Sequence, residues 1–229
     1  MDKAKFFAMA RSGLFAGKLT DDQVSGMEAL LAAFDKARWP LSHAAYGLAT
    51  ALHETARTMQ PIAEYGRGKG KKYGKPDPKT GKIYYGRGFV QLTWFFNYEK
   101  AEKELGYALV SNPDLAMKTD IAAEIMVRGM AEGWFTTRAN KHYLNRTPPD
   151  YVGARKIING TDKDTLIAGY AREFEAALRA AGYGAPVPKG GEIYPVEPAP
   201  EPPAPHQPLP SEGFWAALAR AIAAFFKGK

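Results

Sequence analysis

HETARTMQPIAEYG, residues 53–66, places two carboxylates on either side of a helix-breaking proline. From residue 42 to about residue 59 the apolar residues recur with helical spacing, which predicts a helix that carries Glu54. Pro61 disfavours helical backbone at the residue before it, so this helix should end near that point. Glu64 then lies on the departing loop, which is free to bring a carboxylate across a cleft. The stretch therefore predicts one carboxylate on a helix and a second on the loop that follows.

The face of this helix around Glu54 consists of small residues. Counting 100° per residue, Glu54 lies opposite the apolar stripe and beside Gly47, Thr50 and Ala51. Small residues around one carboxylate leave room either for a ligand or for another backbone, and the pattern does not choose between them. Taken alone, Glu64 is an ordinary loop carboxylate.

A second run, YYGRGFVQLTWFFNY, covers residues 84–98. Its two GRG glycines permit a tight turn or a close approach of backbone to ligand. Three polar side chains follow the glycines: Gln91, Thr93 and Asn97. Amides and hydroxyls of this kind suit sugar hydroxyls and N-acetyl groups, and Tyr85 can stack on a sugar ring, although burial is the commoner fate of an aromatic side chain. Two carboxylates that face such a wall are what acid/base cleavage of a glycan requires.

Composition narrows the kinds of site that are expected. The hydrophobic content of 45% supports a packed core. There is no cysteine, and none of the four histidines has another at i+3 or i+4, so we expect no metal site and no cofactor. The net charge of +7 indicates an anionic partner, such as nucleic acid, acidic lipid or an anionic cell-wall polymer, unless the chain is simply a basic soluble protein.

The sequence has no run of about 20 apolar residues that would span a membrane. The apolar run at residues 6–10 is too short for a secretory leader. We therefore expect synthesis in the cytoplasm, with any substrate in the cell wall or periplasm reached by release or delivery.

The composition changes sharply near residue 185. Between Pro186 and Pro210, 10 of 25 residues are proline, which predicts an extended linker. The tail FWAALARAIAAFF then has its large apolar residues on one helical face, which is typical of a helix that lies on a membrane surface. Docking on the main domain and disorder are the alternatives. The expected organisation is a catalytic domain at 1–185, a linker at 186–210 and an amphipathic helix at 211–229.

Helical spacing predicts further helices in the first domain. Thr20 and Gln23 form a capping box for a helix that ends near Lys36, and Ser42 can cap the next one. Four more helices are expected at residues 92–105, 120–132, 150–158 and 163–181. Residues 66–81 predict a loop or a poorly paired hairpin, with short strands near residues 83–85.

Three motifs together resemble glycoside hydrolase family 19, the chitinase-like branch of the lysozyme superfamily. They are ALHET with Glu54, YYGRGFVQLTWFFNY, and ARKIING with Asn159, and the resemblance covers about residues 40–180. It implies a mainly α, lysozyme-like, two-lobed helical domain with a cleft and at most a short β-hairpin. It also implies inverting cleavage of β-1,4 linkages in N-acetylated glycans.

The resemblance assigns roles to individual residues. It implies that Glu54 is the general acid, that Glu64 is the general base and that Thr93 helps to hold the attacking water. It implies sugar contacts for five residues: His53, Tyr85, Gln91, Asn97 and Asn159. We expect Glu54 to be held neutral by its apolar side and by the proximity of Glu64.

Two departures from the plant members favour a phage endolysin type. The spacing from Glu54 to Glu64 is shorter than in plant chitinases, and the cysteines of the plant proteins are absent. The resulting hypothesis is a monomeric peptidoglycan hydrolase whose tail contacts an anionic membrane surface. The alternatives are a chitinase and a non-catalytic module that binds glycan or nucleic acid. Nucleic acid is the less expected partner, because the basic residues cluster in the loop Arg67–Lys82 without a known binding motif.

Overall fold

The computed structural model describes residues 1–184 of the 229. The described part is mainly helical, as the sequence predicts. The α-helices are α1 (Lys3–Leu14), α2 (Asp21–Lys36), α3 (Leu41–Glu54), α4 (Phe95–Leu105), α5 (Thr119–Glu132), α6 (Lys141–Leu144) and α7 (Asp164–Ala180). The 3-10 helices are η1 (Lys72–Gly74), η2 (Pro113–Met117) and η3 (Gly153–Ile157). The linker and tail predicted for 186–229 lie outside the described residues and stay predictions.

The short β-hairpin is present, although not where the sequence placed its strands. Strands β1 (Ile62–Ala63) and β2 (Arg87–Gly88) pair antiparallel, with Ile62 opposite Gly88. The strands expected near residues 83–85 are therefore wrong by a few positions. Residues 66–81 form a loop of consecutive turns around η1, as predicted.

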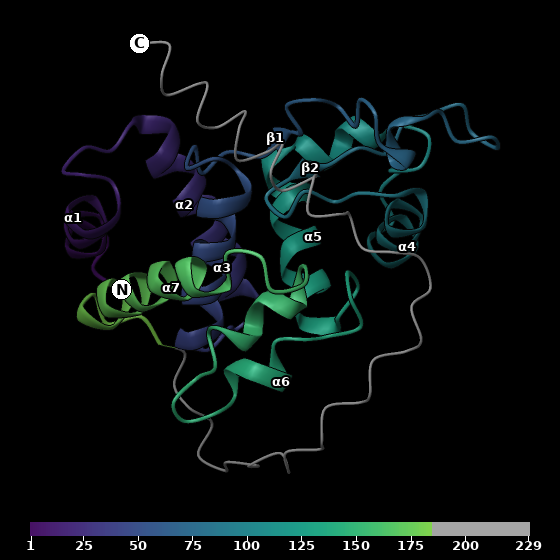
Figure 1. Ribbon diagram of the computed structural model, residues 1–229. Helices are drawn as coiled ribbons and strands as arrows, with labels where there is room; N and C mark the ends of the chain where they lie inside the picture. The colour runs from purple at the N-terminus through teal and green to yellow at the C-terminus, as the bar shows by residue number, and fades with distance from the viewer. Residues whose placement is uncertain (185–229) are drawn as a thin grey trace.

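Helix α3 is the centre of the arrangement. Figure 1 shows α1, α2 and α7 on one side of α3, and α4, α5 and the hairpin on the other. Helix α3 makes its most extensive contacts with α7, while α2 packs against α5. All residues of α3 from Ala44 to Leu52 are buried. A helix that is enclosed on every side is a rigid support for the carboxylate at its end.

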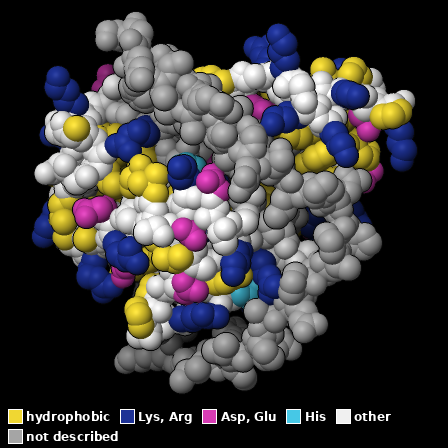
Figure 2. All heavy atoms as spheres, in the orientation of Figure 1, with side chains coloured by type: hydrophobic (Ala, Val, Ile, Leu, Met, Phe, Trp, Pro, Cys, Tyr) yellow, Lys and Arg dark blue, Asp and Glu magenta, His cyan; other side chains and the backbone are white. Residues whose placement is uncertain are grey.

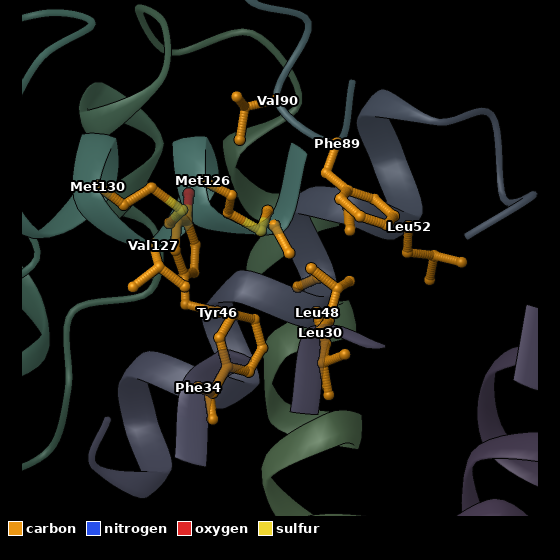
Figure 3. Packing of buried hydrophobic residues seen from close by; sticks show 14 of the residues in the cluster. Leu30, Phe34, Tyr46, Leu48, Leu52, Phe89, Val90, Met126, Val127 and Met130 are labelled. Atoms are coloured by element: carbon orange, nitrogen blue, oxygen red, sulfur yellow. The ribbon is translucent and has the colours of Figure 1, made fainter. Parts of the chain in front are cut away.

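One hydrophobic core joins the two sides of the molecule. Figure 3 shows side chains from α2, α3 and α5 meeting residues from the segment after β2. Examples are Phe34, Leu48, Phe89 and Met126, each of which is fully buried or nearly so. The small-residue face of α3 also takes part, because a Cβ at Gly47 would clash with the ring of Phe34. On that part of the face, packing rather than a ligand occupies the space.

The starts of the helices test the capping predictions. The capping box of α2 is confirmed, since Thr20 accepts a hydrogen bond from the Gln23 amide and the Gln23 side chain accepts one from the Thr20 amide. The Ser42 cap is wrong. Helix α3 begins at Leu41, and the Ser42 hydroxyl donates instead to the carbonyl of Leu144, 102 residues away.

Helix α3 ends five residues before the position predicted from Pro61. The Thr55 hydroxyl donates to the Ala51 carbonyl at 2.7 Å and accepts from the Met59 amide at 3.0 Å, which closes a tight turn. Ala56, Arg57 and Met59 have positive φ in this turn. Glu54 is consequently the last residue of α3 and not a mid-helix residue.

The remaining helix predictions hold in part. Helices α5 and α7 agree with the predicted 120–132 and 163–181 to within one residue at each end. Helix α4 begins three residues later than residue 92, because Trp94 has a φ of 75°. The expected helix at 150–158 is reduced to the 3-10 turn η3.

Gly26 controls how closely α2 approaches the turn after Glu54. A Cβ at Gly26 would lie 1.7 Å from the carbonyl oxygen of Met59, so backbone would have to move. We expect Gly26→Ala to lower the free energy of unfolding by about 1–3 kcal/mol. Gly169→Ala in α7 is the matched control, because its Cβ would meet nothing within 4 Å. Alanine there should stabilise by about 0.5–1 kcal/mol, and urea denaturation of both variants measures the contrast.

Candidate active site

Glu54 is buried at the end of α3 in an ion pair. Its Oε1 atom lies 2.6 Å from Nη1 of Arg155, and both side chains are fully buried. Arg155 belongs to η3 and also donates from Nε to the carbonyl of Asp162 at 3.0 Å. Charges are rarely buried without such a partner, because the interior solvates them poorly. The last turn of α3 and η3 together therefore hold this carboxylate in one place.

The surroundings of Glu54 differ from those that the sequence predicts. We expected an apolar side and a nearby Glu64 to keep the carboxyl group neutral, but its neighbour is a guanidinium group. Its second oxygen, Oε2, is buried and has no hydrogen-bond partner among residues 1–184. One oxygen is thus held by a cation, and the other has unused hydrogen-bonding capacity.

Glu64 follows directly after β1 and is held by the hairpin. Its Oε1 accepts a hydrogen bond from the Tyr73 hydroxyl at 2.9 Å, and its Oε2 accepts one from the Gly86 amide at 3.2 Å. The Glu64 amide donates to the carbonyl of Gly86 at 2.7 Å, which extends the pairing of the strands. The side chain is 8% exposed. Glu64 is therefore oriented by a backbone amide and a phenol.

The pKa of Glu64 is raised, and burial is the largest cause. The hydrogen bonds from Gly86 and Tyr73 and the positive charge of Lys71 oppose this by stabilising the ionised form. A carboxylate with a raised pKa is a stronger base than an exposed one. This is the property that proton abstraction from water needs.

The influences on the pKa of Glu64 predict how activity falls on the acid side of the pH–activity profile. If Glu64 must be ionised, activity should fall with a midpoint above 4.5, the ordinary value for this group. Lys71→Gln and Tyr73→Phe each remove an influence that lowers the pKa of Glu64, so each should move the midpoint to higher pH. The profile of kcat/KM on a soluble glycan fragment measures the shift, and Lys5→Gln, on the exposed face of α1, is the control. A midpoint that is the same in all four proteins would contradict the assignment of Glu64.

The hairpin gathers three of the predicted polar residues near β1 and β2. Gln91 has a φ of 52° and donates from Nε2 to the carbonyls of Ile62 and Gly88. Thr93 donates to the carbonyl of Gln91 at 2.6 Å, which leaves its oxygen able to accept from a water. Asn97, one turn into α4, donates to the carbonyl of Thr93 at 2.9 Å. Gln91 is thus occupied in holding the hairpin together, while Thr93 and Asn97 are partly exposed.

The other predicted sugar-contacting residues are divided between the two carboxylates. Tyr85 is buried in the hairpin cluster, where the guanidinium of Arg87 lies 3.6 Å from its ring centroid. Asn159 lies beside the Glu54 cluster, and its backbone N–H donates to the carbonyl of Arg155 at 2.9 Å. His53 precedes Glu54, and burial lowers its pKa. The structure therefore places the predicted residues in two clusters, one at the end of α3 and one at the hairpin, which residues 55–61 connect along the chain.

Three residues without a predicted role hold these clusters together. Arg155 pairs with Glu54, Tyr73 binds Glu64, and Arg87 binds Asp114 and the carbonyls of residues 83 and 85. The sequence gives a weak indication that Arg155 is buried in a functional role, because it is a charged residue next to the apolar residues Ile157 and Ile158. Tyr73 has none, because its loop has no regular pattern.

Residues 1–184 contain neither a cluster suited to a metal ion nor a helix suited to crossing a membrane. Within residues 1–184, no group of three or more His, Asp or Glu side chains is arranged to hold a metal ion. In the same part of the chain, no helix is both long and apolar enough to cross a membrane.

Comparison with known proteins gives a consistent match. Residues 42–147 match the glycoside hydrolase family 19 profile described as chitinase class I. Chitinase 2 of Oryza sativa subsp. japonica is 40% identical over 116 residues, which cover 49% of this chain and 28% of that protein. Acidic endochitinase Q of Nicotiana tabacum is 36% identical over 152 residues, covering 60% and 53%. The chain thus spans about half, or less, of the length of these relatives.

A solved structure supports the fold. The crystal structure of a chitinase C mutant superimposes with a TM-score of 0.50 at 20% identity, covering 79% of this chain and 91% of that one. The matched segment 42–147 contains both carboxylates and the hairpin. From these matches, residues 42–147 of the chain belong to glycoside hydrolase family 19.

Proposed function

We propose that this protein hydrolyses β-1,4 glycosidic bonds in the glycan strands of peptidoglycan by an inverting acid/base mechanism. The observation that carries the proposal is the pair of buried carboxylates in contrasting surroundings. Glu54 lies against a guanidinium at a helix end, while Glu64 lies against neutral donors in a hairpin. Environments that differ in this way give two carboxyl groups different roles in proton transfer.

In this mechanism Glu64 is the base and Glu54 is the acid. Glu64 takes a proton from a water that Thr93 helps to hold, and the water oxygen bonds to the anomeric carbon from the face opposite the leaving group. As the bond from the anomeric carbon to the leaving oxygen breaks, that oxygen takes a proton from Glu54. The Oε2 atom is the place for this proton, because Oε1 is held by Arg155. The product is a hemiacetal of inverted configuration.

The acid role requires Glu54 to be protonated before it acts. In the structure, Oε1 of Glu54 lies 2.6 Å from Nη1 of Arg155. We infer that the bound glycan excludes water from the site and places its glycosidic oxygen next to Oε2 of Glu54.

Chitin is the second candidate substrate. The relatives described above are named as chitinases, and the same two carboxylates would cleave either polymer. The short spacing between Glu54 and Glu64 and the absence of cysteine support the peptidoglycan assignment.

Digesting purified peptidoglycan and chitin oligomers side by side tests the proposal. In water enriched in ¹⁸O, mass spectrometry should find muropeptides that carry one label at a new reducing end, and early NMR spectra should show the α-anomer. New free amino groups without reducing ends would mean an amidase or peptidase instead. Cleavage of chitin alone would mean a chitinase, and binding without products would mean a non-catalytic module.

The remaining parts of the proposal rest on the sequence. We infer that the enzyme is a monomer, made in the cytoplasm, that reaches the wall after release or delivery. From the spacing of the apolar residues we infer that residues 211–229 form an amphipathic helix suited to an anionic membrane surface.

A further inference from the structure

The whole positive charge excess of the chain lies in one segment. Residues 65–98 contain eight Lys and Arg and one Asp, whereas the rest of the chain contains 23 basic and 23 acidic residues. Six of these basic side chains are exposed: Arg67, Lys69, Lys72, Lys75, Lys79 and Lys82. Figure 2 shows Lys and Arg side chains projecting at the upper right of the molecule, where Figure 1 places the loop between β1 and β2. The excess of positive charge is therefore concentrated in the segment that directly follows Glu64.

A cavity of about 300 Å³ opens within this segment. Four aromatic side chains line it: Tyr73, Tyr84, Trp94 and Phe95. They pack edge to face in two pairs, Tyr73 with Trp94 and Tyr84 with Phe95, each with ring centroids 5.4 Å apart. Aromatic side chains in a concave site are suited to the apolar face of a sugar ring. A cavity of this size accommodates one sugar residue with a substituent.

Two exposed lysines, Lys72 and Lys75, complete the lining. The acid in the lining, Asp77, is engaged by its own loop, because its Oδ1 accepts from the amides of Lys79 and Thr80 and from the Thr80 hydroxyl. The ammonium groups of Lys72 and Lys75 are thus available to an anionic ligand. An aromatic wall with cations at its mouth fits a sugar that carries a carboxylate better than a neutral one.

Tyr73 lies between the cavity and Glu64, the proposed base. Its ring lines the cavity, and its hydroxyl donates to Oε1 of Glu64 at 2.9 Å. A glycan residue bound in the cavity would therefore contact Tyr73, the residue whose hydroxyl orients the proposed base. Lys72 and Lys75 would then bind the same glycan strand that is cleaved, and not a strand held elsewhere on the surface.

We propose that the cavity between η1 and the start of α4 is a subsite for a sugar residue whose substituent carries a free carboxylate, with Lys72 and Lys75 as the residues that recognise this carboxylate. The proposal rests on the proposed function and specifies it. The enzyme selects acidic wall glycan over neutral N-acetylated glycan through this subsite.

The test uses the full-length chain and one glycan in two charge states. Purified peptidoglycan is divided, and the free carboxylates of one half are converted to amides with a carbodiimide and glycinamide. The wild type should show a KM about 3- to 10-fold lower on native than on amidated material, as expected for two partly exposed ion pairs. Lys72→Gln/Lys75→Gln should lose this difference and give the same KM on native and amidated material.

The matched control removes the same charge from a remote surface. Lys5 and Lys18 are exposed near the two ends of α1, which Figure 1 shows on the opposite side of the molecule from α4. Lys5→Gln/Lys18→Gln should keep the preference of the wild type. All four lysines are exposed, so both variants should fold, and thermal unfolding followed by circular dichroism checks this.

Cosedimentation of each protein with the two peptidoglycan preparations separates this inference from the proposed function. Binding that depends on carboxylates and on Lys72 and Lys75, without any hydrolysis, would overturn the proposed function and leave the subsite standing. Hydrolysis without a preference for native material would overturn the subsite alone. Equal losses in the two double variants would also overturn it, since the effect would then be one of net charge.

Discussion

Glu54→Gln is expected to lower kcat on purified peptidoglycan by about 10²- to 10⁴-fold, the range for loss of a general acid. Glutamine keeps the size of the side chain and an oxygen that can accept from Arg155, but it has no acidic proton to give to the leaving oxygen. The loss should appear in kcat more than in KM, because proton donation matters in the transition state and not in binding. Release of reducing ends at saturating substrate measures it.

The buried ion pair means that this variant needs a control for stability. Glu54→Gln replaces a charged partner of Arg155 with a neutral one at a site that water does not reach. The variant should therefore be less stable than the wild type, whereas a simple reading of the sequence expects an intact fold. Assays at 15 °C with the folded fraction measured by circular dichroism separate the two effects. Substantial activity in fully folded Glu54→Gln protein would rule Glu54 out as the acid.

Arg155→Met should have the largest effect on stability, lowering the free energy of unfolding by about 3–5 kcal/mol. Methionine fills much of the space of arginine but leaves the Glu54 carboxylate buried without a cation, and it removes the hydrogen bond to the Asp162 carbonyl. Urea denaturation at pH 7 measures the loss.

A double-mutant cycle shows whether the loss comes from the ion pair. Glu54→Gln/Arg155→Met removes both charges, so it should be less destabilised than the sum of the single variants, and the two changes should be clearly non-additive. Additive losses would mean that Arg155 stabilises the fold through packing and the Asp162 contact instead.

Several elements of the fold were predictable because their causes are local. The capping box at Thr20 and the apolar periodicity of α5 and α7 depend on residues within one or two turns of each other. Both candidate carboxylates were also identified, because the motifs around Glu54 and after Glu64 resemble those of one family. The match of residues 42–147 supports that resemblance.

The errors occur where distant residues compete with local signals. Ser42 is a good cap by type, yet its hydroxyl bonds to Leu144. Pro61 signals a helix end, yet the turn closed by Thr55, whose partner Met59 packs against Gly26 of α2, ends α3 sooner. A propensity argument cannot anticipate a partner from another element.

The sequence by itself indicated the family, the helical class, the two candidate carboxylates and the concentration of positive charge. These depend on residue identity and spacing along the chain. Only the tertiary structure decided what surrounds each carboxylate. Arg155 lies 101 residues from Glu54, and Tyr73 reaches Glu64 from an irregular loop. The physical reason is that the electrostatics of a buried group depend on which atoms packing brings within a few ångströms, and separation along the chain does not specify those atoms.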